Sequence, residues 1–156
     1  MPIVTTIEGR IAQVAIDRPE KRNTLSSELC KDLAREFLEL NDDTRVRSIV
    51  LCGHNNVFCA GLDIEEQLAE NTPIFNEFQK VIDALDALSK PVVAAVSGPA
   101  VSQGAAMLYH CDLVFAGEHA LFSMPGLALG QTPRYGVSLL AVKSGGYKLA
   151  AQKLLL

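Results

Sequence analysis

The sequence has little cysteine and little histidine, and this scarcity argues against several kinds of functional site. Its 156 residues include four cysteines and three histidines. None of them recurs at metal-ligand spacing, and no histidine has a paired nucleophile. The residues concerned are Cys30, Cys52, Cys59, Cys111, His54, His110 and His119. We therefore predict reduced thiols and no metal site.

Positive charge and long apolar runs are scarce as well. The net charge is −4 and the pI about 5.3, which leaves no electrostatic footprint for binding a nucleic-acid backbone. Stretches such as Pro91 to Val96 are far too short to span a bilayer, and the first residues do not open a signal peptide. Neither of the glycine-rich loops that bind nucleotide phosphates is present. We expect a soluble, cytoplasmic protein with no nucleic-acid or membrane partner.

Composition and periodicity favour one α/β domain. The sequence is 49% apolar and 21% charged, and it is long enough for one core. Alternation from Ile11 to Ile16, and apolar runs over Ser48 to Cys52 and Pro91 to Val96, are typical of strands. Apolar residues at three- and four-residue steps predict helices from Ser26 to Leu40 and after Thr72-Pro73. Strands that alternate with helices pair in parallel through crossovers.

The second half of the chain continues this alternation. It predicts a short helix up to about His110, a strand from Asp112 to Ala116 and a helix from Tyr147 onward. That last helix finishes on three leucines without a glycine cap or a polar residue, which favours a chain that is cut short. Six strand side chains are expected to be buried: Ile49, Leu51, Val93, Ala95, Leu113 and Phe115.

Three segments place small residues or glycine where a chain must turn sharply after a buried strand. The first is Arg18-Pro19-Glu20-Lys21-Arg22-Asn23-Thr24-Leu25. The second is Phe58-Cys59-Ala60-Gly61-Leu62-Asp63-Ile64. The third runs from Val96-Ser97-Gly98-Pro99-Ala100 to Gly104-Ala105-Ala106, and Cys111-Asp112 closes it. Glycine in such places lets the backbone approach a ligand closely.

Together these segments resemble the crotonase family, the enoyl-CoA hydratases and isomerases. The second segment is similar to the family pattern F-C-A-G-x-D-[IL], and the third to V-x-G-x-A-x-G-G-G followed by C-D. The resemblance implies a spiral of ββα units with a parallel sheet. It makes residues 1–156 the N-terminal, acyl-CoA-binding core, cut before the C-terminal helical region. It also implies a lyase or isomerase of fatty acid metabolism that acts on a coenzyme A thioester without a further cofactor, as a homotrimer or hexamer.

The resemblance assigns the thioester carbonyl to two backbone N–H groups, those of Leu62 and Gln103. Reactions beside a thioester develop negative charge on its oxygen, and preorganised N–H groups stabilise that charge where water is excluded. The family usually has glycine where this chain has Gln103. We therefore expect Gln103 to adopt a glycine-like dihedral and to narrow the site.

For coenzyme A itself, the resemblance implies contacts from the first two segments. The predicted contacts are Glu20, Lys21, Arg22, Ala60, Leu62, Asp63 and Ile64. The first three would lie along the pantetheine and phosphates, and the others would border the adenine. The alternative is that Lys21 and Arg22 belong to a solvated turn and that Asp63 caps the helix that follows it.

The acid–base residues depart from the family pattern. Hydratases use two glutamates, and the corresponding positions hold Ala106 and Gly126, neither of which can move a proton. The single carboxylate of one isomerase branch is replaced by Arg134. Arginine cannot act as a base, but it could pair with a carboxylate on an acyl group, and Tyr135 could donate or accept a proton.

Two hypotheses follow from this departure. The first is an acyl-CoA-handling enzyme whose reaction is not standard hydration, with Arg134 and Tyr135 as candidate residues. The second is a non-catalytic member that binds an acyl-CoA or a partner protein. A carboxylate, or Tyr135, within reach of the acyl group would favour the enzyme, and an entirely apolar wall would favour the binding protein.

Overall fold

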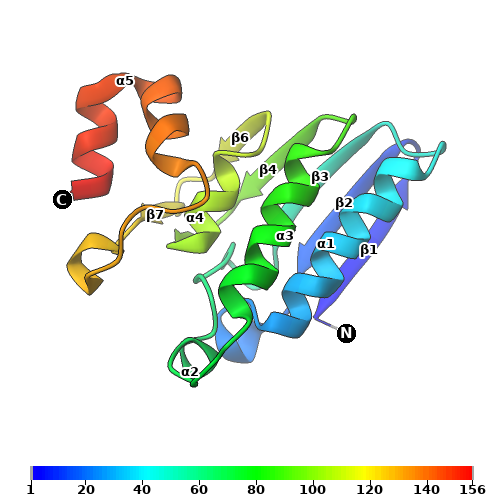
Figure 1. The fold of residues 1–156 in the computed structure, drawn as a ribbon. Coiled ribbons are helices and arrows are strands. Elements are labelled where there is room, and N and C mark those ends of the chain that lie inside the picture. Colours follow the sequence, from blue (N-terminus) through cyan, green and yellow to red (C-terminus); the bar gives the residue numbers. More distant parts are fainter. Residues whose placement is uncertain (1, 156) are drawn as a thin grey trace.

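The computed structural model describes residues 2–155 and has a five-stranded sheet as its largest element. Its strands are β1 (Ile3–Glu8), β2 (Ile11–Ile16), β3 (Ser48–Gly53), β4 (Val92–Val96) and β6 (Leu113–Ala116), in the order β1-β2-β3-β4-β6 (Figure 1). A smaller parallel pair joins β5 (Pro99–Val101) to β7 (Leu121–Ser123). The predicted α/β fold is confirmed.

From β2 to β6 all strand pairs are parallel, as predicted from the alternation of strands and helices. The exception is β1, which pairs with β2 as an antiparallel hairpin. The sequence pattern did not predict β1, because most of its side chains are exposed and it has no clear apolar alternation.

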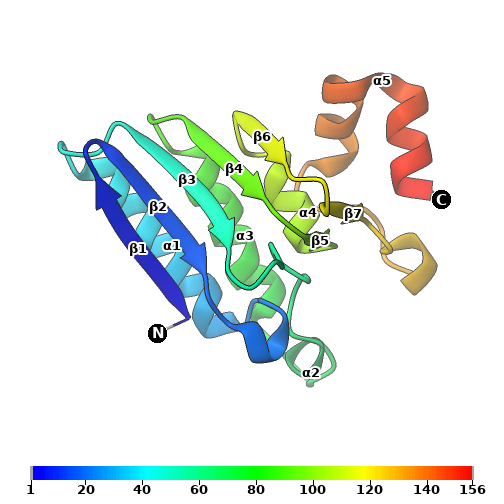
Figure 2. The ribbon, with the colours of Figure 1, turned by 180° about the vertical axis from the view of Figure 1, so that it is seen from behind.

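Two long helices cover one face of the large sheet. They are α1 (Ser27–Asp42) and α3 (Ile74–Asp86), which lie side by side in front of the strands, with the short α4 (Gln103–Leu108) beside them (Figure 1). Seen from behind, the strands lie in front and no helix covers them (Figure 2). The core therefore lies between the sheet and these helices.

The helix starts follow from the local sequence. Ser26 is the N-cap of α1, and its hydroxyl accepts a hydrogen bond from the Leu29 N–H at 3.1 Å. The α3 helix begins at Ile74, after Pro73, and the Thr72 hydroxyl accepts a hydrogen bond from the Ile74 N–H at 3.3 Å. Both predicted helices are thus present at the predicted places.

Of the six strand side chains that were predicted to be buried, only some are. Ile49 and Leu51 are fully buried. In β4 the buried residues are instead Val92, Ala94 and Val96, and Val93 and Ala95 are half-buried. Val92 and Ala94 are in register with the buried Ile49 and Leu51 of β3. The prediction for β4 was wrong because all five of its residues are apolar, so the sequence does not show which face is covered.

For β6 the prediction was also wrong. Leu113 is 56% exposed and Phe115 is 65% exposed. Both residues lie at the edge of the sheet, in register with Val93 and Ala95 on the face that no helix covers. An apolar strand at a sheet edge is buried only if another element packs on it.

The chain ends in α5 (Val137–Leu155), which starts ten residues before the predicted helix from Tyr147. Gly146 has a φ of 77° and a ψ of 165°, and it breaks α5 into two helical parts. Both parts lie beyond the edge of the sheet that β6 forms (Figure 1). Three short helices complete the fold: η1 (Pro19–Lys21), α2 (Ile64–Gln67) and η2 (Leu127–Leu129). Within residues 2–155 no helix is long and apolar enough to cross a membrane.

Candidate active site

The three segments singled out in the sequence meet beyond the carboxyl ends of β2, β3 and β4. Leu25 and Leu62 form a parallel bridge, and the Leu25 N–H donates to the Gly61 carbonyl at 2.8 Å. Cys59 and Ala100 form a second parallel bridge. The second segment therefore lies between the first and the third.

This pairing places the two predicted oxyanion donors close together. A Cβ added to Gly61 would lie 3.1 Å from the Cβ of Ser102 and 3.3 Å from the Oε1 of Gln103. Gly61 has a φ of 97°, so glycine is needed there for conformation as well as for space. Within residues 2–155 the N–H groups of Leu62 and Gln103 have no hydrogen-bond acceptor. Two unpaired N–H groups thus lie at adjacent turns.

The left-handed φ at this turn lies one residue before Gln103. Ser102 has a φ of 54° and a ψ of −117°, whereas Gln103 begins α4. The side chain of Gln103 is buried, and its Oε1 accepts a hydrogen bond from the Ser102 hydroxyl at 2.7 Å. The Gln103 side chain therefore lies against the turn, beside Gly61.

A cavity of about 50 Å³ opens beside Gln103. Ala106 and Gly126, which stand where hydratases have glutamates, both line it. Arg134 and Tyr135 line it as well, and no residue of its wall is an aspartate or a glutamate. The structure thus brings all of these positions together around a space that lacks a carboxylate.

Several contacts fix the chain around Arg134 and Tyr135. The Arg134 guanidinium lies 5.0 Å from the centre of the Phe75 ring. The Tyr135 ring packs edge-on against Phe78, and its hydroxyl lies 3.5 Å from the Phe75 carbonyl oxygen. Burial raises the pKa of Tyr135 above its ordinary value, so the hydroxyl keeps its proton at neutral pH.

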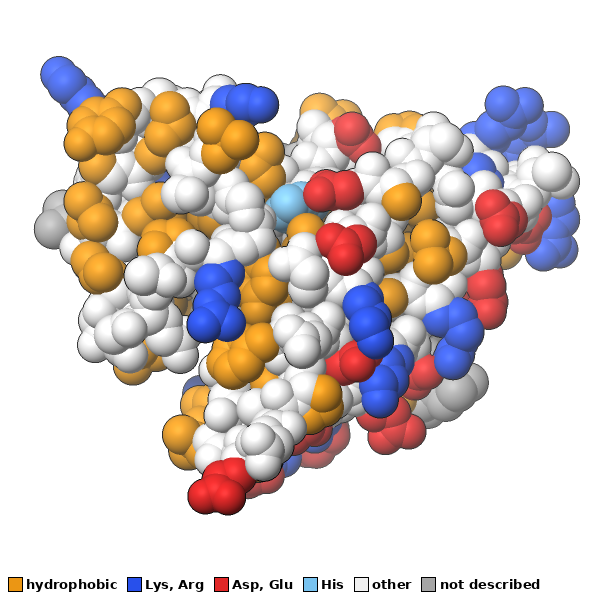
Figure 3. Space-filling view, viewed as in Figure 1, with side chains coloured by type: hydrophobic (Ala, Val, Ile, Leu, Met, Phe, Trp, Pro, Cys, Tyr) orange, Lys and Arg blue, Asp and Glu red, His pale blue; other side chains and the backbone are white. Residues whose placement is uncertain are grey.

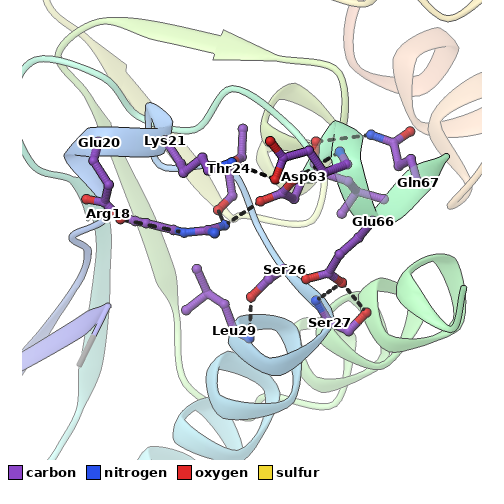
Figure 4. A network of polar contacts seen from close by, with 12 residues as sticks. Arg18, Glu20, Lys21, Thr24, Ser26, Ser27, Leu29, Asp63, Glu66 and Gln67 are labelled. Atoms are coloured by element: carbon purple, nitrogen blue, oxygen red, sulfur yellow. Dashed lines mark hydrogen bonds and ion pairs between the residues drawn. The ribbon is translucent and has the colours of Figure 1, made fainter. Parts of the chain in front are cut away.

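In the first segment, Arg18 has a structural role. Its guanidinium forms an ion pair with Asp63 at 3.0 Å and donates to the Thr24 carbonyl at 3.1 Å (Figure 4). Asp63 is buried and also accepts a hydrogen bond from the Glu65 N–H at 3.1 Å, which caps α2. These contacts join the first segment to the second.

The predicted coenzyme A contacts differ in their exposure and in whether they already form an ion pair. Lys21 forms an ion pair with Glu65 at 2.9 Å, and this hydrogen bond raises the pKa of Lys21. Arg22 is exposed and forms no ion pair within residues 2–155. Ile64 is 66% exposed, as an apolar residue beside a ligand would be before binding. Of the other predicted contacts, Glu20 is exposed and Ala60 is half-buried, whereas the side chain of Leu62 is buried in the core.

Asn23 is a site residue whose role the sequence did not reveal. It is fully buried, and its Oδ1 accepts a hydrogen bond from the Arg18 N–H at 2.8 Å. Its Nδ2 donates to the carbonyls of His54 and Val57, at 3.0 and 2.7 Å. Its backbone has a φ of 55°, which asparagine tolerates better than most residues. The only feature of the sequence that pointed to Asn23 was its position in the first segment.

His110 has no metal-ligand spacing and no paired nucleophile in the sequence, and the structure gives it two defined polar contacts. Its Nδ1 lies 2.7 Å from an Asp86 carboxylate oxygen, and its Nε2 lies 2.9 Å from the Tyr135 carbonyl oxygen. The side chain is only 5% exposed. His110 thus joins the end of α3 to the turn that carries Arg134 and Tyr135.

The thiol nearest the two turns is Cys59. It is fully buried, and desolvation raises its pKa to about 12. A thiol with so high a pKa is not a nucleophile at neutral pH. Within residues 2–155 no three side chains of histidine, cysteine, aspartate or glutamate gather as they would around a metal ion.

Comparison with known proteins gives the same family as the three segments. Residues 6–156 match the sequence model described as Enoyl-CoA hydratase/isomerase. The chain belongs to the enoyl-CoA hydratase/isomerase family. The enoyl-CoA hydratase/isomerase structure from Pseudoalteromonas atlantica covers 99% of this chain with a TM-score of 0.92 and 32% identity.

Two relatives with similar sequences are both named as hydratases. The short-chain-enoyl-CoA hydratase of Clostridium acetobutylicum is 35% identical over 139 residues, which are 86% of this chain and 53% of the relative. The 2,3-dehydroadipyl-CoA hydratase of Escherichia coli is 31% identical over 155 residues, which are 98% of this chain and 61% of the relative. The chain therefore spans between half and two thirds of the length of these relatives.

Proposed function

We propose that this protein binds a coenzyme A thioester and stabilises negative charge on its carbonyl oxygen with the N–H groups of Leu62 and Gln103. The observation that carries the proposal is that, within residues 2–155, the N–H groups of Leu62 and Gln103 have no acceptor and belong to turns that pack against each other, and that Gln103 lines the cavity. Such groups are worth most when they are aimed in advance at the developing charge. Both lie in segments that match the family pattern.

We further propose that the reaction is not ordinary hydration of an enoyl-CoA. Hydration needs one group that activates water and another that delivers a proton to carbon. Ala106 and Gly126 supply neither, and no aspartate or glutamate among residues 2–155 lines the cavity. Tyr135 is the remaining candidate for proton transfer. Its hydroxyl is protonated at neutral pH, so it can donate a proton but not accept one, and the pKa raised by burial makes it a weak donor.

A panel of acyl-CoA thioesters, assayed for both binding and turnover, tests the proposal. Binding with turnover of at least one thioester is the expected result. Binding without turnover would support the second candidate function, a non-catalytic acyl-CoA-binding protein, which the missing carboxylates favour. If no thioester binds, both proposals are wrong.

The coenzyme A moiety would contact Arg22 and Lys21 with its phosphates and Ala60 and Ile64 with its adenine. The support is the family resemblance together with the free guanidinium of Arg22 and the exposed side chain of Ile64. Assembly as a homotrimer or hexamer, a role in fatty acid metabolism and a cytoplasmic location belong to the same proposal.

A further inference from the structure

We infer that the acyl group of the substrate carries a carboxylate at the end remote from the thioester, and that Arg134 binds it. This inference rests on the proposed function, because it concerns the acyl half of the same ligand. It names a class of substrate, the short-chain dicarboxylic acid monothioesters of coenzyme A.

The first step is the charge of the cavity wall. Arg134 is the one charged residue among those of residues 2–155 that line the cavity. Around it the wall is apolar or carries neutral polar groups, and these residues include Phe75, Met124, Leu127, Thr132 and Pro133. A cavity with a single positive charge and no negative charge favours an anionic ligand.

The second step is that Arg134 has no carboxylate partner of its own. Within residues 2–155 it forms no ion pair, whereas Arg18, Arg35 and Arg45 each do. Its guanidinium instead lies over the face of the Phe75 ring in a cation–π contact. Stacking on an aromatic ring leaves the edge of a guanidinium able to donate hydrogen bonds to a carboxylate. The same guanidinium lies close enough to the Tyr135 hydroxyl to oppose the rise in the pKa of Tyr135 that burial causes.

The third step is that the backbone at Arg134, whose side chain is exposed, is held by its neighbours. The Val137 N–H donates to the Arg134 carbonyl at 3.2 Å. The next residue, Tyr135, is held by Phe78 through its ring and by His110 through its carbonyl. A cation placed in advance loses less entropy when it binds its ligand.

The fourth step is the size of the cavity. Its volume of about 50 Å³ holds only a few water molecules, so it suits a short acyl group. The cavity extends from Gln103, one of the proposed thioester donors, to Arg134. A short chain with a thioester at one end and a carboxylate at the other would meet a donor at each end.

The experiment compares succinyl-CoA and glutaryl-CoA with butyryl-CoA, which is neutral and of similar length, by titration calorimetry on the purified protein. We expect the wild type to bind the carboxylate-bearing thioesters more tightly by about ten- to hundredfold, since hydrogen bonds to charged groups are strong. Arg134→Gln should abolish this preference, so that the three thioesters bind about equally. Arg134→Lys should keep part of it.

Arg22→Gln is the matched control, because it removes a cation outside the cavity wall. It should weaken the binding of all three thioesters alike. Butyryl-CoA bound as tightly as succinyl-CoA by the wild type, or an equal loss for every thioester in Arg134→Gln, would overturn the inference and leave the proposed function standing. If the wild type binds none of the thioesters, the proposed function and the inference are both wrong.

Discussion

At the scale of single residues, the site is defined by which side chains are small. Gly104 is the clearest case, because a Cβ there would lie 2.3 Å from the Cys59 carbonyl oxygen and 2.8 Å from the Cys59 Cβ. That close approach brings the start of α4 against the second segment, and so sets Gln103 beside Leu62. Ala106 and Gly126 then leave the cavity without a carboxylate.

Gly104→Ala is predicted to destabilise the protein by about 2–3 kcal/mol, because the added methyl group meets backbone that cannot move aside. Gly126→Ala is the matched control. Its φ of −53° suits any residue, and its Cβ would lie 3.5 Å from the nearest atom, an ordinary contact. Chemical denaturation of both variants measures the difference. Equal stabilities would mean that the two segments are not packed as described.

The second residue-scale prediction concerns hydration. General acid–base groups typically contribute about 100- to 10,000-fold each, so the wild type should hydrate crotonyl-CoA poorly. Ala106→Glu combined with Gly126→Glu should raise this rate measurably. The control combines Ala106→Gln with Gly126→Gln, which adds similar volume without a group that exchanges protons. Wild-type hydration at ordinary family rates would show that the base lies elsewhere.

At the scale of elements, the sequence predicted those helices and strands whose apolar residues recur in a clear pattern. The stripe of Leu29, Leu33, Phe37 and Leu40 with the Ser26 cap predicted α1 almost to the residue. β5 and β7 were missed because three residues are too few to show alternation. The site segments were recognised, but the ion pair between Arg18 and Asp63 depends on a long-range contact that no local pattern reveals.

The first segment supplies the prediction at this scale. Arg22→Gln should weaken coenzyme A binding about two- to fivefold at low salt, and less at high salt, because exposed charges are screened. Lys21→Gln should have a smaller effect, since Glu65 already neutralises Lys21. Arg47→Gln is the control, because this exposed residue precedes β3 at the opposite end of the sheet. If all three variants bind coenzyme A as tightly as the wild type, Arg22 belongs to a solvated turn and not to the coenzyme A site.

At the scale of the whole molecule, several apolar side chains are exposed, and two groups of them bear on assembly. One is the open face of the large sheet, with Leu113 and Phe115. The other is α5, where Leu139 is 59% and Tyr147 is 76% exposed. Apolar side chains also gather over the part of the surface that α5 forms, whereas charges are more frequent over α1 and α3 (Figure 3). Exposed apolar patches of this kind are typical of interaction surfaces.

We predict that the protein self-associates through α5. Sedimentation velocity should show an oligomer, and Leu139→Glu combined with Tyr147→Glu should shift it toward the monomer. Leu38→Glu is the control, since Leu38 is 48% exposed on α1, away from α5. A clean monomer at high protein concentration would contradict the prediction.

The central claim is that the N–H groups of Leu62 and Gln103 both donate to a thioester carbonyl. Infrared spectroscopy of a bound acyl-CoA with an isotope-labelled thioester carbonyl tests it most directly, because hydrogen bonds to the oxygen weaken the C=O bond. The account predicts that the carbonyl band of the bound thioester moves to lower frequency than that of the free thioester in water. A bound thioester whose carbonyl band does not move, or moves to higher frequency, would contradict it.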